Sequence, residues 1–431
     1  MTSAATLEIL ERYRKVMFPA AAPYHGDNPI VVSHAKDQYL WDIEGNRYLD
    51  FFGGVLTVSV GHCNDEVTRA THEQLDKVQH TTTIYINEIT IRLAEKVASL
   101  TPGNLKKVYF TNSGTEANET AIMAARMYTG CPTVITLRHA YSGRSVTAMT
   151  LTAHGTWRLG GVVDPYIRHV RNPYVFRATR GMTPEQVVDD CVRDLEETLA
   201  TVTDGRIAAF MAEPIQGVGG FIVPPKDYFK RIYPIVKAAG GVFISDEVQT
   251  GWGRTGGKWF GIEQFDVVPD IMTFAKGMGN GTPIGCTVTT PEIAEAVKGA
   301  TFSTFGGNPV TMATALATIE YIEKHDLKHN AEVQGAVLRA KLEELKQEFP
   351  WIGEVRGMGL MQAIEIVKPG TIEPDAARTT AFINKARDNG LLVGKGGLYG
   401  NVIRISPHLN VSSADMAEGT AILAKTCVDI S

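Results

Sequence analysis

The chain has 431 residues, 44% of them hydrophobic, and a formal net charge of −5, so it is long enough for two or three domains with large cores. Basic residues do not cluster with aromatic ones, which argues against nucleic-acid binding. No apolar run reaches the roughly 18 residues that a membrane span needs. The five cysteines are an odd number without paired spacing, and we expect reduced thiols in a cytoplasmic protein.

The N-terminal part predicts a β-hairpin over residues 39–50. Glu44-Gly45-Asn46 separates two stretches that carry aromatic residues, and such a short loop with a glycine is typical of a hairpin turn. We expect residues 1–57 to join a smaller domain formed by the C-terminal part of the chain.

The next informative segment predicts a strand, a turn and a helix. A strand over residues 107–111 is followed by the turn Ser113-Gly114-Thr115 and by helix formers over Glu116–Tyr128, with Gly130 placed as a stop. Backbone N–H groups at such a helix start can bind a phosphate, and the hydroxyl groups add donors. The same residues also fit an ordinary helix cap, with Ser113 or Thr115 as the capping residue.

The middle of the chain predicts an α/β fold. Helical patterns over Asp227–Ala239 and Glu292–Lys298 alternate with short apolar strands, which favours a mostly parallel sheet covered by helices. Residues 153–177 are rich in Gly, Pro and Arg, and we expect a loop over the mouth of the site. The strands are expected at Ile207–Ala212, Val242–Ser245, Ile271–Phe274 and Ile284–Val288.

An acidic pair follows one of these strands. Asp246 and Glu247 stand where Val242–Ser245 ends, and open α/β sheets bind ligands at the carboxyl ends of their strands. An acid in this place can pair with a protonated ring nitrogen of a cofactor. Asp246 is equally compatible with a helix cap or a turn.

A lysine follows the next strand. Lys276 comes after the apolar run Ile271–Ala275 and before glycines at 277, 279 and 281. An apolar setting disfavours the ammonium form, and the glycines allow a flat cofactor to approach. Both features favour a lysine that forms a Schiff base. The alternative is a lysine at a strand end that reaches solvent.

The pattern changes after Asn308-Pro309. Helical stretches run to His325 and over Ala331–Phe349, and strands are expected near Gly359–Val367, at Leu391–Val393 and around Arg404. This pattern of helices and strands predicts a smaller α+β domain. The expected boundaries are an N-terminal segment at 1–57, a large cofactor-binding domain at 58–310 and a small domain at 311–431.

A phosphate cradle, an acid for a ring nitrogen and a Schiff-base lysine together describe a site for pyridoxal 5'-phosphate. Other cofactor classes fit less well. No Gly-x-Gly-x-x-Gly turn follows an early strand, and Gly256-Gly257-Lys258 precedes Trp259 rather than the Ser or Thr of a P-loop. Clustered metal-ligand spacing is missing as well, so we expect no metal.

The chain also resembles a known family. It is similar to the class III aminotransferases, the ω-transaminase-type branch of the fold-type I pyridoxal phosphate enzymes. Within that family it is most similar to class III alanine–glyoxylate aminotransferases and their phospho-lyase relatives. The similarity covers nearly the whole chain and rests on Tyr48-Leu49-Asp50, Thr57–Cys63, Ser113–Ala117, Glu213–Gly217, Asp246–Gly251, Lys276-Gly277, Ser303–Pro309 and Ile403-Arg404-Ile405.

The resemblance implies roles for these residues. Lys276 would carry the cofactor and then transfer the substrate proton, and Asp246 would pair with the pyridine nitrogen. Val248 and Tyr141 would cover the two faces of the ring, and Gln249 would approach its phenolic oxygen. The implied cofactor-binding residues are Ser113, Gly114, Thr115, Tyr141, Glu213, Asp246, Val248, Gln249, Lys276 and Thr304.

Three more positions bear on partners and substrates. Thr304 would reach the phosphate from a second subunit, which implies a homodimer with shared active sites. Arg404 would bind a substrate carboxylate through its planar fork of donors. Val218 stands where dual-specificity members often have a glutamate that neutralises this arginine, so the resemblance favours substrates with an anion close to the amine.

Two reactions stay open at this point. The resemblance implies an aminotransferase that moves an amino group from an amino acid or amine to a 2-oxo acid such as pyruvate or glyoxylate. Some relatives are instead phospho-lyases that eliminate phosphate from ethanolamine phosphate or a similar phosphorylated amine. Arg144 lies where the ring-stacking motif departs from the family pattern. It could bind a substrate phosphate, or it could be a surface or salt-bridge arginine.

Overall fold

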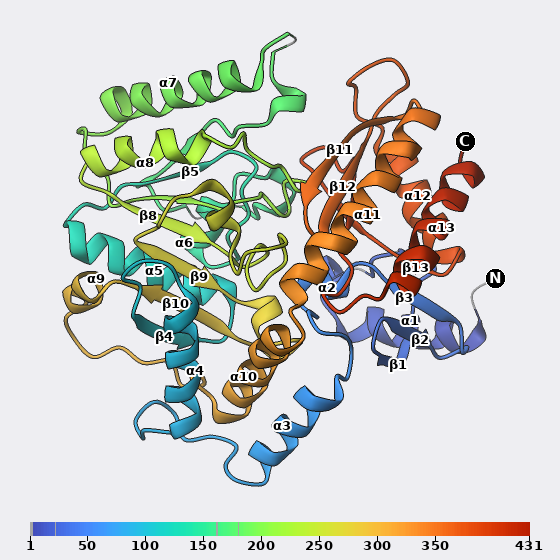
Figure 1. Ribbon diagram of the computed structural model, residues 1–431, viewed down its shortest axis with the longest axis horizontal. Coiled ribbons are helices and arrows are strands. Elements are labelled where there is room, and N and C mark those ends of the chain that lie inside the picture. Colours follow the sequence, from blue (N-terminus) through green and yellow to red (C-terminus); the bar gives the residue numbers. More distant parts are fainter. Residues whose placement is uncertain (1–2, 22, 161–162, 180) are drawn as a thin grey trace.

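The computed structural model describes residues 3–21, 23–160, 163–179 and 181–431 (Figure 1). A sheet of seven strands in the order β4-β10-β9-β8-β7-β5-β6 forms the centre of the larger part of the molecule. All of its strands except β10 run in one direction, because β10 pairs antiparallel with both β4 and β9. The strands are β4 (Lys107–Thr111), β5 (Val134–Leu137), β6 (Ile167–Val170), β7 (Ala209–Ala212), β8 (Val242–Asp246), β9 (Ile271–Phe274) and β10 (Gly285–Thr289).

The expected α/β fold with a mostly parallel sheet is therefore confirmed. Every residue of β5, β7, β8 and β9 is buried, as expected for strands with helices over both faces of the sheet. The helices around this sheet are α3 (Asp65–Leu75), α4 (Glu88–Leu100), α5 (Gly114–Thr129), α6 (Val146–Leu151), α7 (Pro184–Val202), α8 (Tyr228–Ala238), α9 (Pro291–Ala296) and α10 (Pro309–Lys324).

Helix α5 begins and ends as its sequence predicts. The Ser113 hydroxyl accepts a hydrogen bond from the Glu116 backbone N–H, which caps the first turn. Gly130 ends the helix in a left-handed conformation with φ of 65°, which a residue without Cβ adopts at little cost. The start of this helix therefore lies directly after β4, at one edge of the sheet.

The second part of the molecule is built from both ends of the chain. One sheet joins the three N-terminal strands to β13 in the order β1-β2-β3-β13, and Figure 1 shows these strands beside the C-terminal helices. The other sheet has the order β11-β12-β15-β14. The strands are β1 (Val32–Lys36), β2 (Tyr39–Asp42), β3 (Arg47–Asp50), β11 (Ile352–Met358), β12 (Met361–Ile366), β13 (Leu391–Leu392), β14 (Gly394–Gly396) and β15 (Val402–Ile405).

The helices of this part are α1 (Ala4–Val16), α2 (Gly53–Leu56), α11 (Leu327–Glu348), α12 (Ala376–Asp388) and α13 (Ser413–Asp429). The predicted hairpin over residues 39–50 is confirmed by the antiparallel pairing of β2 with β3. The parallel pairing of β3 with β13 ties the N-terminal segment to the C-terminal part. The exact domain boundaries remain a prediction.

The loop expected over residues 153–177 is partly wrong. It contains β6, an edge strand of the large sheet that pairs in parallel with β5, and two short 3₁₀ turns. Ile167 and Val170 are buried against the sheet, whereas the Gly, Pro and Arg residues around them dominate the composition of the segment. Residues 161–162 of this range lie outside the described residues.

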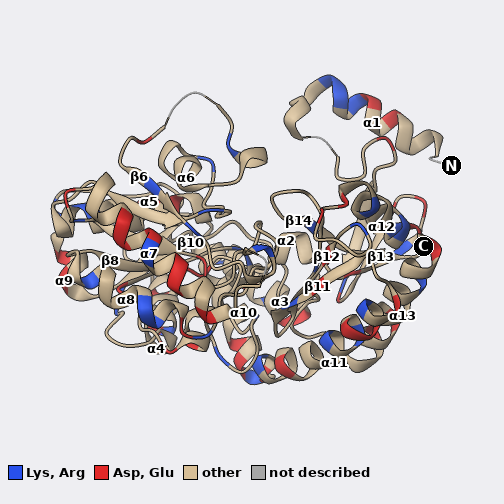
Figure 2. Cartoon of the chain, turned by 90° about the horizontal axis from the view of Figure 1, so that it is seen from above, with Lys and Arg blue, Asp and Glu red and all other residues tan. Residues whose placement is uncertain are grey.

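Charged residues of both signs are interspersed along the outer helix α11, whereas α7 is mostly acidic (Figure 2). Among the described residues, no helix is long and apolar enough to cross a membrane.

Candidate active site

One cavity collects most of the residues that the sequence singled out. It has a volume of about 180 Å³ and lies at the carboxyl ends of β4, β8 and β9. Of the predicted cofactor-binding residues, Thr304 alone does not line it. The lining residues are Ser113, Gly114, Thr115, Asn118, Tyr141, Ser142, Gly143, Arg144, Glu213, Asp246, Val248, Gln249, Ala275 and Lys276.

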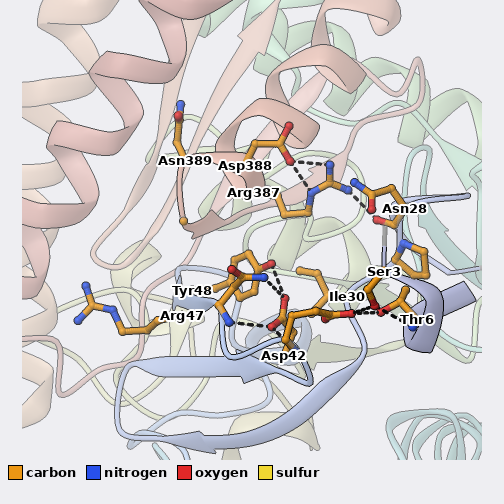
Figure 3. Close-up of a pocket in the computed structure, with 14 residues that line it drawn as sticks. Ser3, Thr6, Asn28, Ile30, Asp42, Arg47, Tyr48, Arg387, Asp388 and Asn389 are labelled. Carbon is orange, nitrogen blue, oxygen red and sulfur yellow. Dashed lines mark hydrogen bonds and ion pairs between the residues drawn. The ribbon is translucent and has the colours of Figure 1, made fainter. Parts of the chain in front are cut away.

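A more voluminous polar pocket lies elsewhere, between α1, the β2–β3 hairpin and the end of α12 (Figure 3). Its polar side chains bond to one another. The Tyr48 hydroxyl donates to Asp42 at 2.8 Å, and the Arg387 guanidinium pairs with Asp388 at 2.6 Å. Asp42, Arg387 and Asp388 of that pocket are thus paired locally, whereas most of the predicted site residues line the smaller cavity.

Lys276 lies at the end of β9, where its backbone turns sharply with φ of 44°. Burial lowers the pKa of its amine to about 8, although the nearby carboxylates Asp246 and Glu213 oppose this shift. The guanidinium of Arg404 acts in the same direction as burial. More of the amine is therefore neutral near neutral pH than in an exposed lysine, which favours its action as a nucleophile or proton acceptor.

Asp246 ends the neighbouring strand β8 and is buried, with 4% of its surface exposed. Its carboxylate accepts hydrogen bonds from the Asn118 side chain at 3.0 Å and from the Val248 backbone at 3.1 Å. Burial raises the pKa of Asp246, while these two donors oppose the rise. A fixed, poorly solvated carboxylate of this kind is suited to hold a proton on an opposing ring nitrogen.

Asn118 is a site residue that the sequence prediction missed. It lies on α5, and its side-chain N–H groups donate to Asp246 and to the backbone oxygen of Ser142. It follows Gly114 by four positions and therefore lies on the same helix face as the predicted phosphate cradle. This spacing is the signal that could have identified it.

Glu213 is a second buried carboxyl group in the cavity. It accepts hydrogen bonds from the backbone N–H groups of Tyr141 at 3.1 Å and Gly217 at 2.8 Å, and so joins two loops. Burial, followed by the charge of Asp246, raises the pKa of Glu213 to about 8. Gln249 packs directly against Gly217, and its buried side-chain oxygen has no hydrogen-bond partner among the described residues.

The residues at the start of α5 fit a phosphorylated, flat ring. A Cβ on Gly114 would lie 3.3 Å from the Val248 side chain, so the glycine lets the start of α5 pack tightly against the residue expected to cover the ring. The Thr115 hydroxyl accepts a hydrogen bond from the Arg144 backbone N–H at 3.1 Å. Together with the unpartnered oxygen of Gln249 and the carboxylate of Asp246, this cradle matches the donors and acceptors that pyridoxal phosphate needs.

Arg404 lies on β15, outside the lining of this cavity. Its guanidinium is 5.1 Å from the ring centre of Phe52 and 5.7 Å from that of Phe221, and its Nε donates to the Lys395 backbone oxygen. Burial lowers the pKa of Arg404 to about 10. Its Nη1 is buried and has no hydrogen-bond partner among the described residues, which leaves a donor for an anion.

The other two predicted residues are placed differently. Arg144 lines the cavity, but its side chain is exposed. Thr304 is exposed and is not among the residues that line the cavity of its own chain, and Phe302 and Phe305 near it in the sequence are exposed as well. The predicted contact of Thr304 with a cofactor phosphate therefore remains a prediction.

Comparison with known proteins agrees with this geometry. The family model described as "Aminotransferase class-III" matches residues 20–427. The chain is 43% identical over 389 residues to the mitochondrial alanine–glyoxylate aminotransferase 2 homolog 2 of Arabidopsis thaliana, covering 90% of this chain and 80% of the relative.

Solved structures are similar as well. A thermostable (S)-enantioselective ω-transaminase from Thermomicrobium roseum aligns with a TM-score of 0.91 at 34% identity, covering 100% of this chain and 99% of that one. A phospholyase from Arthrobacter in complex with phosphoethanolamine aligns with a TM-score of 0.90 at 31% identity, covering 97% and 99%.

The charge on Asp246 should be more important than its shape. We expect Asp246→Asn to reduce turnover by orders of magnitude, because each pKa unit that the ring nitrogen loses corresponds to about 1.4 kcal/mol. Asn118→Ala should reduce turnover about tenfold or more, but less than Asp246→Asn, since a hydrogen bond to a charged group contributes about 1.5–3 kcal/mol. Steady-state kinetics of both variants, with cofactor content measured in parallel, would test this order. Near-normal turnover of Asp246→Asn with full cofactor content would contradict it.

Proposed function

Because the chain belongs to the class-III aminotransferases, a family that uses pyridoxal phosphate, we propose that it moves an amino group from an amino acid to a 2-oxo acid such as pyruvate or glyoxylate. The bound cofactor supplies an electron-withdrawing ring that stabilises negative charge on the carbon beside the substrate nitrogen. The side chains of the cavity must bind this ring, hold its charge and move protons.

We infer the following roles from their positions. The neutral amine of Lys276 would bind the cofactor covalently and, once the substrate amine has displaced it, would take and return the substrate proton. Asp246, oriented by Asn118, keeps the ring nitrogen protonated. Val248 and Tyr141 cover the two ring faces, and Gln249 contacts the phenolic oxygen.

The phosphate end of the ring has its own set of donors. The residues proposed to hold it are Ser113, Gly114 and Thr115 at the start of α5. Glu213 fixes the loops around the ring through Tyr141 and Gly217.

The single observation that favours amino acid substrates is the state of Arg404. This guanidinium is buried between two aromatic rings and has a free donor. Val218, which is 9% exposed, contributes no carboxylate where a glutamate could neutralise it. A desolvated cation that has no carboxylate partner among the described residues gains most from a substrate anion, and its planar fork suits a carboxylate. We therefore propose a substrate with its carboxylate close to the amine.

A phospho-lyase reaction is the second candidate. The specific observation in its favour is Arg144, which lines the cavity with an exposed side chain. The similarity to the phospholyase solved with phosphoethanolamine points the same way. In that reaction Lys276 would again remove the proton from the carbon that carries the substrate nitrogen. A phosphate on the next carbon would then leave, whereas in transamination a proton returns. Arg404 argues for transamination because phosphoethanolamine carries no carboxylate.

We further propose a homodimer with shared active sites. Thr304 is close in the sequence to exposed aromatic residues, and the nearby Ile84, Tyr85 and Ile86 have 69%, 70% and 91% of their surfaces exposed. The two segments are adjacent, since a Cβ on Gly307 would lie 3.5 Å from the Thr83 side chain and the ring centres of His80 and Phe305 are 5.0 Å apart. A contiguous apolar surface of this kind is typical of a subunit interface. In such a dimer Thr304 would reach the cofactor phosphate of the partner subunit.

We also propose a cytoplasmic location, which agrees with the absence of disulfide bonds among the five cysteines, all of them free thiols. The Arabidopsis relative is named as mitochondrial. Fractionation of cells that express the full gene would decide between the two compartments.

Two assays distinguish the candidate reactions. We expect alanine to convert the protein to its amino-loaded form and glyoxylate or pyruvate to restore it, with no phosphate released. Arg404→Ala should weaken binding of such carboxylate substrates by roughly 2–5 kcal/mol, while the matched Arg144→Ala should have little effect. Spectroscopic half-reactions and a phosphate assay with ethanolamine phosphate would be run on the same preparations. Sustained phosphate release, sensitivity to Arg144→Ala and no reaction with any amino acid would contradict the proposal.

The shared site can be tested by complementation. Thr304→Asp should inactivate a homodimer, because its charge repels the partner's phosphate, and Lys276→Ala should inactivate it by removing the amine. When the two variants are unfolded and refolded together, hybrid dimers contain one site with both native groups. We expect activity to return in the mixture, measured against each variant refolded alone. A mixture that forms hybrids but stays inactive would contradict the sharing of the site.

A further inference from the structure

The segment from Asp50 to His62 lies where the two parts of the molecule meet, and Figure 1 shows α2 of this segment at that boundary. On one side it is bonded to the chain that carries Arg404. The Ser406 backbone N–H donates to the Phe51 oxygen, and the Leu409 N–H donates to the Ser59 oxygen, both at 2.7 Å. The segment therefore moves with the strand that holds the substrate-binding arginine.

On its other side the same segment is bonded to the turn that carries Lys276. The Asn280 side chain accepts hydrogen bonds from the backbone N–H groups of Ser59 at 2.7 Å and Val60 at 3.0 Å, and donates to Gly61 at 3.1 Å. Gly277 is so close that a Cβ there would lie 2.4 Å from the Ser59 hydroxyl. A single stretch of chain thus spans the distance between the catalytic lysine and the arginine.

The middle of this stretch is strained. Residues 53–56 all adopt left-handed backbone conformations, with φ of 55°, 58°, 66° and 58°. Two of them, Val55 and Leu56, have side chains for which this conformation costs roughly 1–2 kcal/mol each. A strained turn persists only when its surroundings hold it.

Asp50 stabilises this strained turn. One oxygen of its carboxylate accepts hydrogen bonds from the backbone N–H groups of Phe52 and Gly53, both at 2.9 Å, and the other accepts from His62 Nε2 at 2.9 Å. His408, fully buried, lies 3.7 Å from the same oxygen and packs against Gly53. Burial by itself would raise the pKa of Asp50, but the two imidazoles hold it far below its usual range.

The Asp50 carboxylate is also connected to Arg404, through Phe52. Phe52, whose backbone N–H donates to Asp50, has its ring centre 5.1 Å from the guanidinium of Arg404. His62 follows Gly61, which is bonded to Asn280 on the lysine turn. A continuous chain of contacts therefore runs from Lys276 through Asn280, His62 and Asp50 to Phe52 and Arg404.

We propose that Asp50 and His62 are positioning residues that fix the separation of Lys276 and Arg404 and thereby select α-amino acids over ω-amino acids. The proposal rests on the transaminase function with Arg404 as the carboxylate ligand. An α-amino acid holds its amine and carboxylate a short, fixed distance apart, so a rigid frame binds it without cost. A flexible ω-amino acid such as 5-aminovalerate adapts to a looser frame.

The test measures kcat and KM for alanine and for 5-aminovalerate. Relative to the native protein, Asp50→Asn and His62→Ala should lower the preference for alanine at least about tenfold, a difference of about 1.4 kcal/mol, mainly through a higher KM for alanine. His62→Gln keeps an N–H donor and should retain most of the preference. His169→Ala is the matched control, since it removes a half-buried imidazole of β6 that is hydrogen-bonded to the backbone of Leu151.

The outcomes are distinct. If the native protein does not react with alanine, the proposed function fails before the frame is tested. If the native protein reacts but Asp50→Asn and His62→Ala lower kcat/KM for both substrates by the same factor, the pattern expected of His169→Ala, the two residues are only structural. The proposal is then overturned. Should Asp50→Asn not fold, the comparison of His62→Ala with His62→Gln decides alone.

A metal ion is an alternative explanation for the same cluster, because the ligand atoms of Asp50, His62 and His408 all lie within 4.8 Å of one another. The frame proposed here depends on hydrogen bonds. Native protein dialysed against a chelator should therefore keep its preference for alanine. A preference that is lost on dialysis and restored by zinc would contradict the proposal.

Discussion

The site depends on the burial of three ionisable groups in one small cavity. Lys276, Asp246 and Glu213 all line it, and each is displaced from its usual titration range by the loss of solvent. Burial raises the pKa of both carboxyl groups and lowers that of the amine, so the groups favour neutral forms unless a partner stabilises the charge. This imbalance makes the lysine reactive and leaves the acids ready to pair with a charged ligand.

The sheet brings these groups together from distant parts of the sequence. Strands β8 and β9 are parallel neighbours, and their adjacent carboxyl ends place Asp246 beside Lys276. Strand β4 is separated from β9 by β10. It leads into the start of α5, so Ser113 and Gly114 lie at the same edge of the sheet. Polar residues that follow parallel strands converge in this way in open α/β sheets.

Much of this arrangement could be predicted from local sequence. Apolar runs bounded by glycine located β8 and β9, and Gly130 located the end of α5, because each of these signals acts over a few residues. The loop expected at residues 153–177 was wrong for β6, since four strand residues within a Gly- and Pro-rich stretch carry little signal. Strand β11 was not predicted at all.

The remaining features depend on contacts between distant residues. The local sequence predicts only that Asn118 is a helix residue. The fold shows that its side chain donates a hydrogen bond to Asp246, which is 128 positions away in the sequence. Likewise, Asp50 is bonded to His62 and lies two residues before Phe52, whose ring packs against Arg404. No local sequence pattern connects this pair with Arg404. The predicted roles of Arg144 and Thr304 rest on a ligand and a second subunit.

The most direct test of the account is the pKa of Lys276 in cofactor-free protein. The rate at which an amine-specific reagent labels Lys276, followed by peptide mass spectrometry over a pH series, reports the fraction of neutral amine. We predict a midpoint near pH 8, since burial lowers the pKa of this amine to about 8. Asp246→Asn should move the midpoint lower, because the aspartate charge favours the ammonium form. A midpoint near the ordinary lysine value of about 10.4, unchanged in Asp246→Asn, would contradict the account.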